Sequence, residues 1–172
     1  SSRRRHTRCS RDWSSDVCSS DLRTNAASCV LQVRAADGRA ALLTGDIGVA
    51  EEQALVSRVG ARLRSEVLVV PHHGSRSSSS EALLVAAAPR WAVIQVGYRS
   101  RFGHPHAEVL TRYEAHGITV VRSDWCGAWV WREDEAACTR VVRRRLWHDV
   151  EGAPASTNHG ALVAITPSGE PE

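Results

Sequence analysis

Three short polar motifs hold the side chains that could do chemistry in this chain. Asp46 ends the run LLTGD, His72 and His73 lie in VPHHGS, and His104 and His106 lie in GHPH. Carboxylate oxygens and imidazole nitrogens are common ligands of divalent metals, and hydrolytic metal sites keep one position open for water. The residue types therefore predict a divalent-metal site, provided that the fold brings the three motifs together.

Each motif is expected to follow the end of a strand. The apolar runs over Ala40–Thr44, Glu66–Val70 and Trp91–Val96 are typical of strands, and the middle run is apolar enough to be buried on both faces. Open α/β sheets collect functional side chains beyond the carboxyl ends of their strands. The spacing therefore predicts that the three motifs share one edge of a sheet.

Each motif also has a purely structural interpretation. Asp46 could hold a turn or cap a helix, and the His-His-Gly-Ser run could be a surface loop in which Gly74 permits a sharp bend. Pro105 could begin a helix, with His104 or His106 as its cap. All three structural interpretations would have to hold together at three strand ends, and this coincidence favours the metal site.

The remaining periodicity completes an α/β pattern. Alternating residues over Ser28–Arg34 predict a strand that forms a hairpin with the strand from Ala40, through a turn at residues 36–39. Apolar residues at helical spacing predict helices, and further apolar runs predict strands. The predicted helices are Val49–Leu63, Ser80–Ala88 and Pro105–His116, and the predicted later strands are Ile118–Arg122, Gly127–Arg132 and Thr139–Arg145. The second of these helices would have Ser80 or Ser79 as its N-cap. This order predicts an α/β sandwich with helices packed outside the sheets.

The two ends of the chain differ from its middle. Residues 1–22 lack helical or strand periodicity and resemble a translated sequencing adapter that ends in DVCSSDL, with a disordered basic arm as the alternative. We treat this segment as non-native. The absence of Met leads us to expect a fragment, with a partial domain over residues 23–150 and a flexible tail over residues 151–172.

Composition narrows the function only slightly. The formal charge of +3 is too small to indicate nucleic-acid binding by itself. No apolar run in the sequence approaches the roughly 18 to 20 residues that span a bilayer. Cys29, Cys126 and Cys138 show no CxxC spacing, so we expect small apolar side chains in strands and neither a zinc knuckle nor a disulfide framework.

Aromatic and basic residues near the C-terminal end allow two interpretations each. Trp129 and Trp131 would share one face of a strand; together with Trp125 they either pack the outer helices, which we favour, or stack nucleic-acid bases. Arg140 and Arg143–Arg145 are either a solvated strand end, which we favour, or a contact to a DNA backbone.

In this order, LLTGDI, VPHHGS and GHPH resemble the C-terminal metallo-β-lactamase-like domain of the ComEC family of DNA-uptake competence proteins. The resemblance runs from about Asn25 to about Trp147, and Asn25 and Ser28 match the family's lead into the first strand. It implies the C-terminal part of an αββα metallo-β-lactamase sandwich, truncated at its N-terminus. Loss of the first half would leave the hairpin from Ser28 with an exposed apolar face, so we expect aggregation.

The resemblance also implies roles for individual residues. Asp46 matches the acidic ligand that bridges two metals, Zn or Mn, and His104 matches a late ligand of the second metal. His73, with His72 as the alternative, matches a histidine that acts as general acid or contacts the scissile phosphate, and Ser75 would orient it or bind phosphate. The implied reaction is attack of a metal-activated water on phosphorus, while His73 protonates the leaving oxygen.

One feature departs from the family pattern, because the superfamily motif HxHxDH is missing from this sequence. One Asp and one or two His fall short of the three or four protein ligands of a stable site, so we expect this chain to bind metal weakly and to be inactive.

The resemblance implies a complete parent that is a nuclease degrading one DNA strand during transformation. Its soluble domain would face the periplasm or exterior of a bacterial inner membrane. Its partners would be single-stranded DNA and an upstream transmembrane channel domain of the same parent, with no partner protein. Two alternatives are a free-standing metallo-β-lactamase-fold hydrolase of another ester or phosphodiester, and a degenerate domain that binds DNA or a partner without cleavage.

Overall fold

The computed structural model describes residues 24–132 and 135–143 of the chain. The predicted adapter-like segment, residues 1–22, and the predicted tail, residues 151–172, lie outside the described residues. No helix in the described part is long and apolar enough to cross a membrane.

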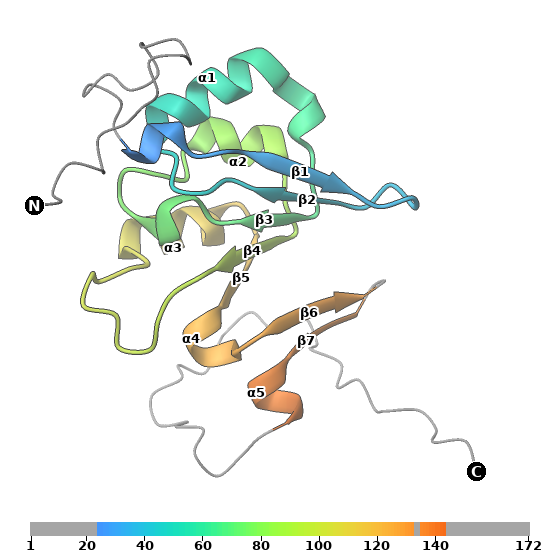
Figure 1. Ribbon diagram of the computed structural model, residues 1–172, viewed down its shortest axis with the longest axis vertical. Coiled ribbons are helices and arrows are strands. Elements are labelled where there is room, and N and C mark those ends of the chain that lie inside the picture. Colours follow the sequence, from blue (N-terminus) through green and yellow to red (C-terminus); the bar gives the residue numbers. More distant parts are fainter. Residues whose placement is uncertain (1–23, 133–134, 144–172) are drawn as a thin grey trace, which may run out of the picture.

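A five-stranded sheet forms the centre of the structure (Figure 1). Strand β1 (Leu31–Arg34) pairs antiparallel with β2 (Ala40–Leu43), which confirms the predicted hairpin. Strands β2, β3 (Val67–Val69), β4 (Trp91–Ile94) and β5 (Thr119–Arg122) then lie parallel in chain order. The predicted α/β class is therefore confirmed. The parallel strands require crossover connections, and helices supply them.

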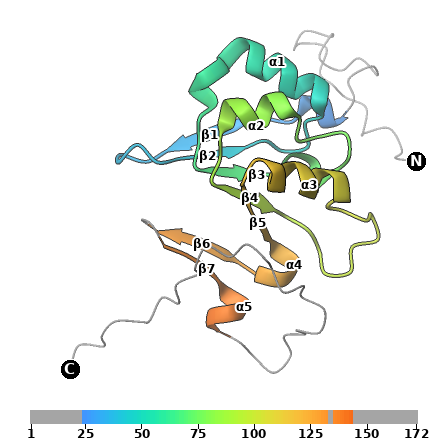
Figure 2. The ribbon, with the colours of Figure 1, turned by 180° about the vertical axis from the view of Figure 1, so that it is seen from behind.

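Three helices cover one face of this sheet, as Figures 1 and 2 show from opposite sides. Helix α1 (Val49–Val59) passes into the 3-10 turn η3 (Gly60–Leu63), where Gly60 with φ +55° ends the predicted longer helix. Helix α2 (Glu81–Ala87) has Ser80 as its N-cap, as predicted, and α3 is Ala107–Ala115. The core between helices and sheet contains Leu42, Leu68 and Ile94 from the strands and Leu55, Leu83 and Val109 from the helices.

The opposite face of the sheet is covered by a second, two-stranded sheet of β6 (Trp129–Arg132) and β7 (Glu135–Cys138). Trp129 packs against Trp91 of β4, with ring centroids 5.8 Å apart, and stacks on Trp131 at 6.5 Å. The prediction that these tryptophans pack the outer helices is therefore wrong, because they fill the space between two sheets.

The β6–β7 hairpin leaves the β1 end of this face uncovered. In the register of the sheet, Leu31 pairs with Leu43, and Val33 pairs with Ala41. Ala41 pairs in turn with Val67, which is covered by the β6–β7 hairpin. These five residues therefore lie on the same face of the sheet. Leu31, Val33 and Leu43 are exposed. The expected exposed apolar face is thus confirmed, and the aggregation that it implies stays a prediction.

The C-terminal strand predicted over Thr139–Arg145 is wrong. Strand β7 ends at Cys138, where its register with β6 also ends, and Thr139–Val142 forms the short helix α5. The hydroxyl of Thr139 accepts the Ala128 N–H at 2.9 Å, and Arg140 donates to the Asp124 carbonyl. Arg140 therefore has a structural partner, and the predicted cluster members at 144 and 145 lie outside the described residues.

A disulfide joins Cys126, at the end of the short helix α4 (Ser123–Cys126), to Cys138, and both residues are buried. The expectation that these two cysteines form no disulfide is wrong; they are 12 residues apart, a separation that no CxxC motif marks. Cys138 does lie in a strand, β7, as predicted, whereas Cys126 and Cys29 do not, and Cys29 is free and exposed. The disulfide ties the second sheet to the end of β5.

We expect replacement of both bridge cysteines by Ser to lower the free energy of unfolding by about 2 kcal/mol, because the unfolded chain regains the freedom of a short loop. Urea denaturation with and without reductant measures this, and the matched control Cys29→Ser should leave the midpoint unchanged. If the reductant changes neither the midpoint nor the amide protection of β6 and β7, the disulfide does not hold the second sheet.

Candidate functional site

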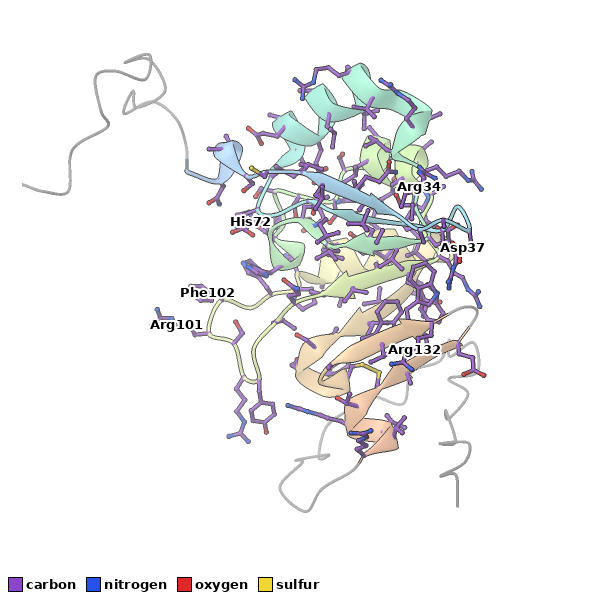
Figure 3. All side chains as sticks on the ribbon, turned by 45° about the vertical axis from the view of Figure 1, so that its right-hand side comes forward. Arg34, Asp37, His72, Arg101, Phe102 and Arg132 are labelled. Carbon is purple, nitrogen blue, oxygen red and sulfur yellow. A yellow bond between two sulfur atoms is a disulfide. The ribbon has the colours of Figure 1, made fainter. Side chains whose placement is uncertain are left out.

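The three motifs meet at the carboxyl edge of the parallel strands. Asp46 follows β2, His72 and His73 follow β3, and His104 follows β4. Because these strands are adjacent and parallel, their carboxyl ends lie side by side. The predicted common edge is therefore confirmed, and Figure 3 shows His72 on it.

Asp46 is positioned through a hydrogen bond of its backbone N–H, so its carboxylate does not take part in this bond. The Asp46 N–H donates to the Ser28 hydroxyl at 3.1 Å. Gly45, with φ +59°, lies so close to Ser28 that an added Cβ would come within 2.9 Å of the serine Cβ. The tight turn thus explains both the glycine before the aspartate and the serine before the first strand.

His73 contacts Asp46. Its Nδ1 lies 2.7 Å from the carbonyl oxygen of Gln95, and its Nε2 lies 3.6 Å from Oδ1 of Asp46. Because a carbonyl only accepts, Nδ1 carries the hydrogen and Nε2 of the neutral ring carries the lone pair. The backbone beyond β4 therefore directs one defined nitrogen of His73 towards the carboxylate.

The His72–His73 pair has an unusual backbone. His72 has φ 49° and His73 has φ 55°, a left-handed region that costs non-glycine residues of order 1–3 kcal/mol each. The His72 N–H donates to the Gly45 carbonyl at 3.1 Å, which fixes this turn against the Asp46 turn. Left-handed turns held in this way place two adjacent imidazoles at the same edge.

The His72 ring lies between Asn25 and His104. The amide nitrogen Nδ2 of Asn25 is 3.3 Å from Nε2 of His72, and the His72 and His104 ring centroids are 6.1 Å apart. Asp46 thus contacts His73, whereas His104 contacts His72. Sequence analysis assigned Asn25 no role beyond its family position, because its hydrogen-bond partner is 47 residues away.

The VPHHGS and GHPH motifs are joined through Gly74. The His106 N–H donates to the Gly74 carbonyl at 2.9 Å, and an added Cβ on Gly74 would come within 2.8 Å of Cβ of Pro105. The His104–Pro105 peptide bond is cis. The contact of Gly74 with Pro105 and His106 places His104 beside the turn that carries His72 and His73.

His106 has the structural role that was left open. Its Nδ1 accepts the Glu108 N–H as the N-cap of α3, and its Nε2 contacts Arg76 at 2.8 Å. Helix α3 therefore begins two residues later than predicted, after Pro105. The side chain of His104 does not take part in this cap.

Ser75 faces the following turn. Its hydroxyl lies 3.2 Å from that of Ser77, and its N–H donates to the His72 carbonyl at 2.9 Å. Among the described residues, no hydrogen bond joins Ser75 to the His73 ring, so the orienting role implied for Ser75 has no direct contact behind it. The two neighbouring hydroxyls form a small polar group beside the imidazoles.

The pKa of the His104 ring is lowered by its surroundings. Burial lowers the pKa of its ring below the ordinary value of 6.5, and positive charge on His72, His73 and His106 lowers it further. His104 is therefore neutral at pH 7, the form that binds metals.

We expect the His104 ring of the metal-free chain to titrate below pH 6.5, measured by NMR. Because the pKa in the folded state is below that of the unfolded chain, the stability linked to His104 is complete above pH 6.5 and is lost as the pH falls through the folded pKa. His72→Ala should raise the His104 pKa. Titration at or above 6.5 would contradict the electrostatic account.

The donors at this edge suit a divalent metal in kind, being one carboxylate and neutral imidazoles. Within residues 24–132 and 135–143, no three His, Cys, Asp or Glu side chains are grouped closely enough to hold a metal ion. The described donors come as two pairs, Asp46 with His73 and His72 with His104.

Part of this chain is similar to known proteins. It is 46% identical over 104 residues to "Competence protein ComA" of Neisseria gonorrhoeae, and 37% identical over 90 residues to "ComE operon protein 3" of Bacillus subtilis strain 168. Part of this chain is homologous to competence proteins. A third relative, "Recombination protein 2" of Haemophilus influenzae, is 39% identical over 97 residues.

The alignments with these three relatives cover 60%, 52% and 56% of this chain. They cover only 15%, 12% and 12% of the relatives' own lengths, so the chain corresponds to a small part of each. No family model matches the chain.

Proposed function

We propose that this chain is part of a metal-dependent hydrolase in a ComEC-type competence protein, which cuts one strand of DNA during its uptake. One observation carries the proposal: Asp46, His72, His73 and His104 meet at one sheet edge, in a chain that is homologous in part to competence proteins. The substrate and reaction proposed for the parent are those that the resemblance of the motifs implies, and the chain alone is expected to be inactive.

For the fold, we propose one half of a metallo-β-lactamase sandwich. Two features support this assignment: helices α1, α2 and α3 cover one face of the large sheet, and the β6–β7 sheet packs on the other. The exposed apolar side chains of β1 and β2 lie on the face where a larger second sheet would pack.

Asp46 and His104 would hold the metal, Zn or Mn, in a two-metal site of the complete parent. Ser28 binds the backbone of Asp46 and leaves its carboxylate facing His73, and His104 is neutral at pH 7 because its pKa is lowered. When bound, the metal would activate water and polarise a phosphoryl oxygen.

His73 is our candidate for the proton donor to the leaving oxygen. Its Nδ1 hydrogen is held by the Gln95 carbonyl, so Nε2, which lies 3.6 Å from Oδ1 of Asp46, is the nitrogen that would pass a proton to the leaving oxygen. The hydroxyls of Ser75 and Ser77, 3.2 Å apart, are hydrogen-bond donors that could bind a phosphate oxygen. His72, whose ring contacts Asn25, is the alternative proton donor.

For the location, we propose the periplasm-facing or exterior side of a bacterial inner membrane. The Cys126–Cys138 disulfide supports this, because such bonds persist in oxidising compartments and are rare in the cytosol. The upstream transmembrane channel domain of the parent would deliver or receive the DNA strand.

A second candidate is a domain that binds DNA without cutting it. The absence of a three-ligand group among the described residues favours this alternative. The two candidates make opposite predictions for cleavage and the same prediction for DNA binding.

The test places residues 25–147 in a full-length competence protein, in place of the matching segment, and measures Mn²⁺-dependent cleavage of labelled single-stranded DNA. Asp46→Asn and His104→Ala should abolish cleavage, and His73→Gln should slow it by about 10²- to 10⁴-fold. The matched control His116→Ala, whose ring pairs with Glu81 away from this edge, should cut normally. Cleavage that survives Asp46→Asn would overturn the proposal, and a folded chimaera that binds DNA without cutting it supports the second candidate.

A further inference from the structure

Three aromatic side chains are exposed in the described part of the chain, and all three belong to the edge that carries the histidines. Tyr98 is 49% exposed, Phe102 68% and Trp125 40%. The other tryptophans described, together with Tyr113, are buried or partly buried. Exposed aromatic surface gathered in one region is typical of a binding site.

Tyr98 and Phe102 lie in the loop of residues 97–103, GYRSRFG, between β4 and His104. Figure 3 shows Arg101 and Phe102 at the projecting end of this loop, on the same side of the molecule as His72. The Phe102 ring is nearly parallel to that of His104, at 16° and 6.4 Å between centroids. The aromatic loop is thus continuous with the candidate site.

Trp125 comes from helix α4, which is fastened to the base of the same loop. The Ser123 hydroxyl accepts the Val96 N–H and donates to the Val96 carbonyl, both at 2.8 Å. These two bonds place α4 directly beside the start of the loop. The helix that carries Trp125 is therefore tied to the residue just before the loop that carries Tyr98 and Phe102, although the two segments are distant in sequence.

Each exposed aromatic ring has an arginine next to it. The guanidinium carbons of Arg99 and Arg101 lie 5.2 Å and 5.1 Å from the ring centroids of Tyr98 and Phe102. That of Arg122 lies 3.8 Å from Trp125, although Asp124 neutralises part of its charge. The loop itself carries two arginines and no acidic residue. The surface thus alternates flat apolar rings with positive charge.

A single strand of nucleic acid has the complementary pattern. Its unpaired bases offer flat faces for stacking, and its phosphates are spaced between them. A duplex hides those faces within its own stack, so it would use the arginines alone. A protein partner would match the rings and has no need of the repeated positive charge.

We propose that loop 97–103, with Trp125, is a binding surface for single-stranded DNA, in which bases stack on Phe102 and Tyr98 and phosphates pair with Arg99 and Arg101. The loop would lead the strand to His104. This inference rests on the proposed function, because it takes the strand cut at that edge as its ligand, but binding itself needs no metal.

The test measures fluorescence anisotropy of a labelled 15-nucleotide oligo-dT with the full chain, in EDTA. Phe102→Ala and Tyr98→Ala should each weaken binding about tenfold. Neither should affect binding of an abasic strand of equal length, which keeps the phosphates and lacks the bases. The matched control Val85→Ala, which changes an exposed apolar residue of α2, should bind the oligo-dT as tightly as the unmutated chain does.

Charge is tested separately. Arg101→Gln should weaken binding of both the oligo-dT and the abasic strand, and should reduce the slope of log affinity against log salt by about 0.7. Arg58→Gln, the same change on the exposed surface of α1, should do neither. The melting temperature of each variant should match that of the unmutated chain, because all these side chains are exposed.

Three results would overturn the inference: unchanged oligo-dT binding by Phe102→Ala and Tyr98→Ala, equal affinity for the abasic strand, or binding of vesicles with anionic phosphatidylglycerol instead of the oligonucleotide. The hydrolase proposal is overturned by a different result. If the loop binds DNA but no metal-dependent cleavage is found, the hydrolase proposal is wrong and the inference about the loop stands. If DNA is cleaved but the loop does not bind it, the inference about the loop is wrong and the hydrolase proposal stands.

Discussion

Gly74→Ala should lower the free energy of unfolding by about 3 kcal/mol and displace His104 from the histidine turn. Gly74 has φ +79°, which costs an L-residue roughly 1–2 kcal/mol. Its new Cβ would also come within 2.8 Å of Pro105, and overpacking of a buried contact costs about 1–3 kcal/mol more. Urea denaturation measures the loss, and the NMR titration of His104 reports the displacement.

A second glycine separates the two causes. Gly117 has φ +65° but no atom within 4 Å of an added Cβ, so Gly117→Ala carries only the backbone cost of about 1–2 kcal/mol. The difference between the variants is the contact with Pro105. Equal losses would show that this contact does not hold the two motifs together, and an unchanged His104 titration in Gly74→Ala would show the same.

Glu52→Ala should lower the free energy of unfolding by about 4 kcal/mol. Glu52 is fully buried, and its two carboxylate oxygens accept the N–H groups of Ser79 and Ser80, each at 2.6 Å. Each buried N–H that loses its partner costs about 1–3 kcal/mol. Glu52→Gln, which has a single acceptor oxygen, should cost about half as much.

This carboxylate also supports the site. It anchors the end of the serine run that begins at Ser75, and Arg112 and Tyr113 bind the same run from α3. The surface control is Glu51→Ala, which removes only the capping bond to the Gly48 N–H and should cost about 1 kcal/mol. Similar losses in the two alanine variants would contradict the anchoring role of Glu52.

The parts of the fold that sequence predicted are those with a local cause. Apolar runs ending in polar motifs predicted the parallel strands, and their common carboxyl edge followed from topology alone. The same logic placed Asp46, His73 and His104 together. The Ser80 cap was found because a side-chain hydroxyl three residues before an amide is a local signal.

The missed features depend on contacts between distant residues. The Gln95 carbonyl that fixes the His73 ring is 22 residues away and belongs to the backbone, which any residue type could supply. The left-handed turn at His72 depends on the Gly45 carbonyl for the same reason. Helix α5 was taken for a strand because its valines favour strands locally, whereas the pairing partner β6 ends opposite Cys138.

The exposed aromatic loop shows a different limit. Its alternation of rings and arginines is visible in the sequence, but only the fold shows that Tyr98 and Phe102 are exposed and that Phe102 stacks near His104. The opposite outcome holds for Trp129 and Trp131, which were weighed as stacking residues and instead fill the space between the sheets. Burial therefore decides which aromatic residues are available to a ligand.

The central claim is that the strand-end carboxylate and histidines form one metal-binding edge. Titration of the chain with substoichiometric Mn²⁺, followed through the NMR signals of the histidine rings, tests it most directly. We predict selective broadening of His72, His73 and His104 and little effect on His116, whose ring pairs with Glu81 before β5, at the opposite edge of the sheet. Asp46→Asn should abolish the selectivity. Uniform broadening of all four rings, or selective broadening that survives Asp46→Asn, would contradict the account.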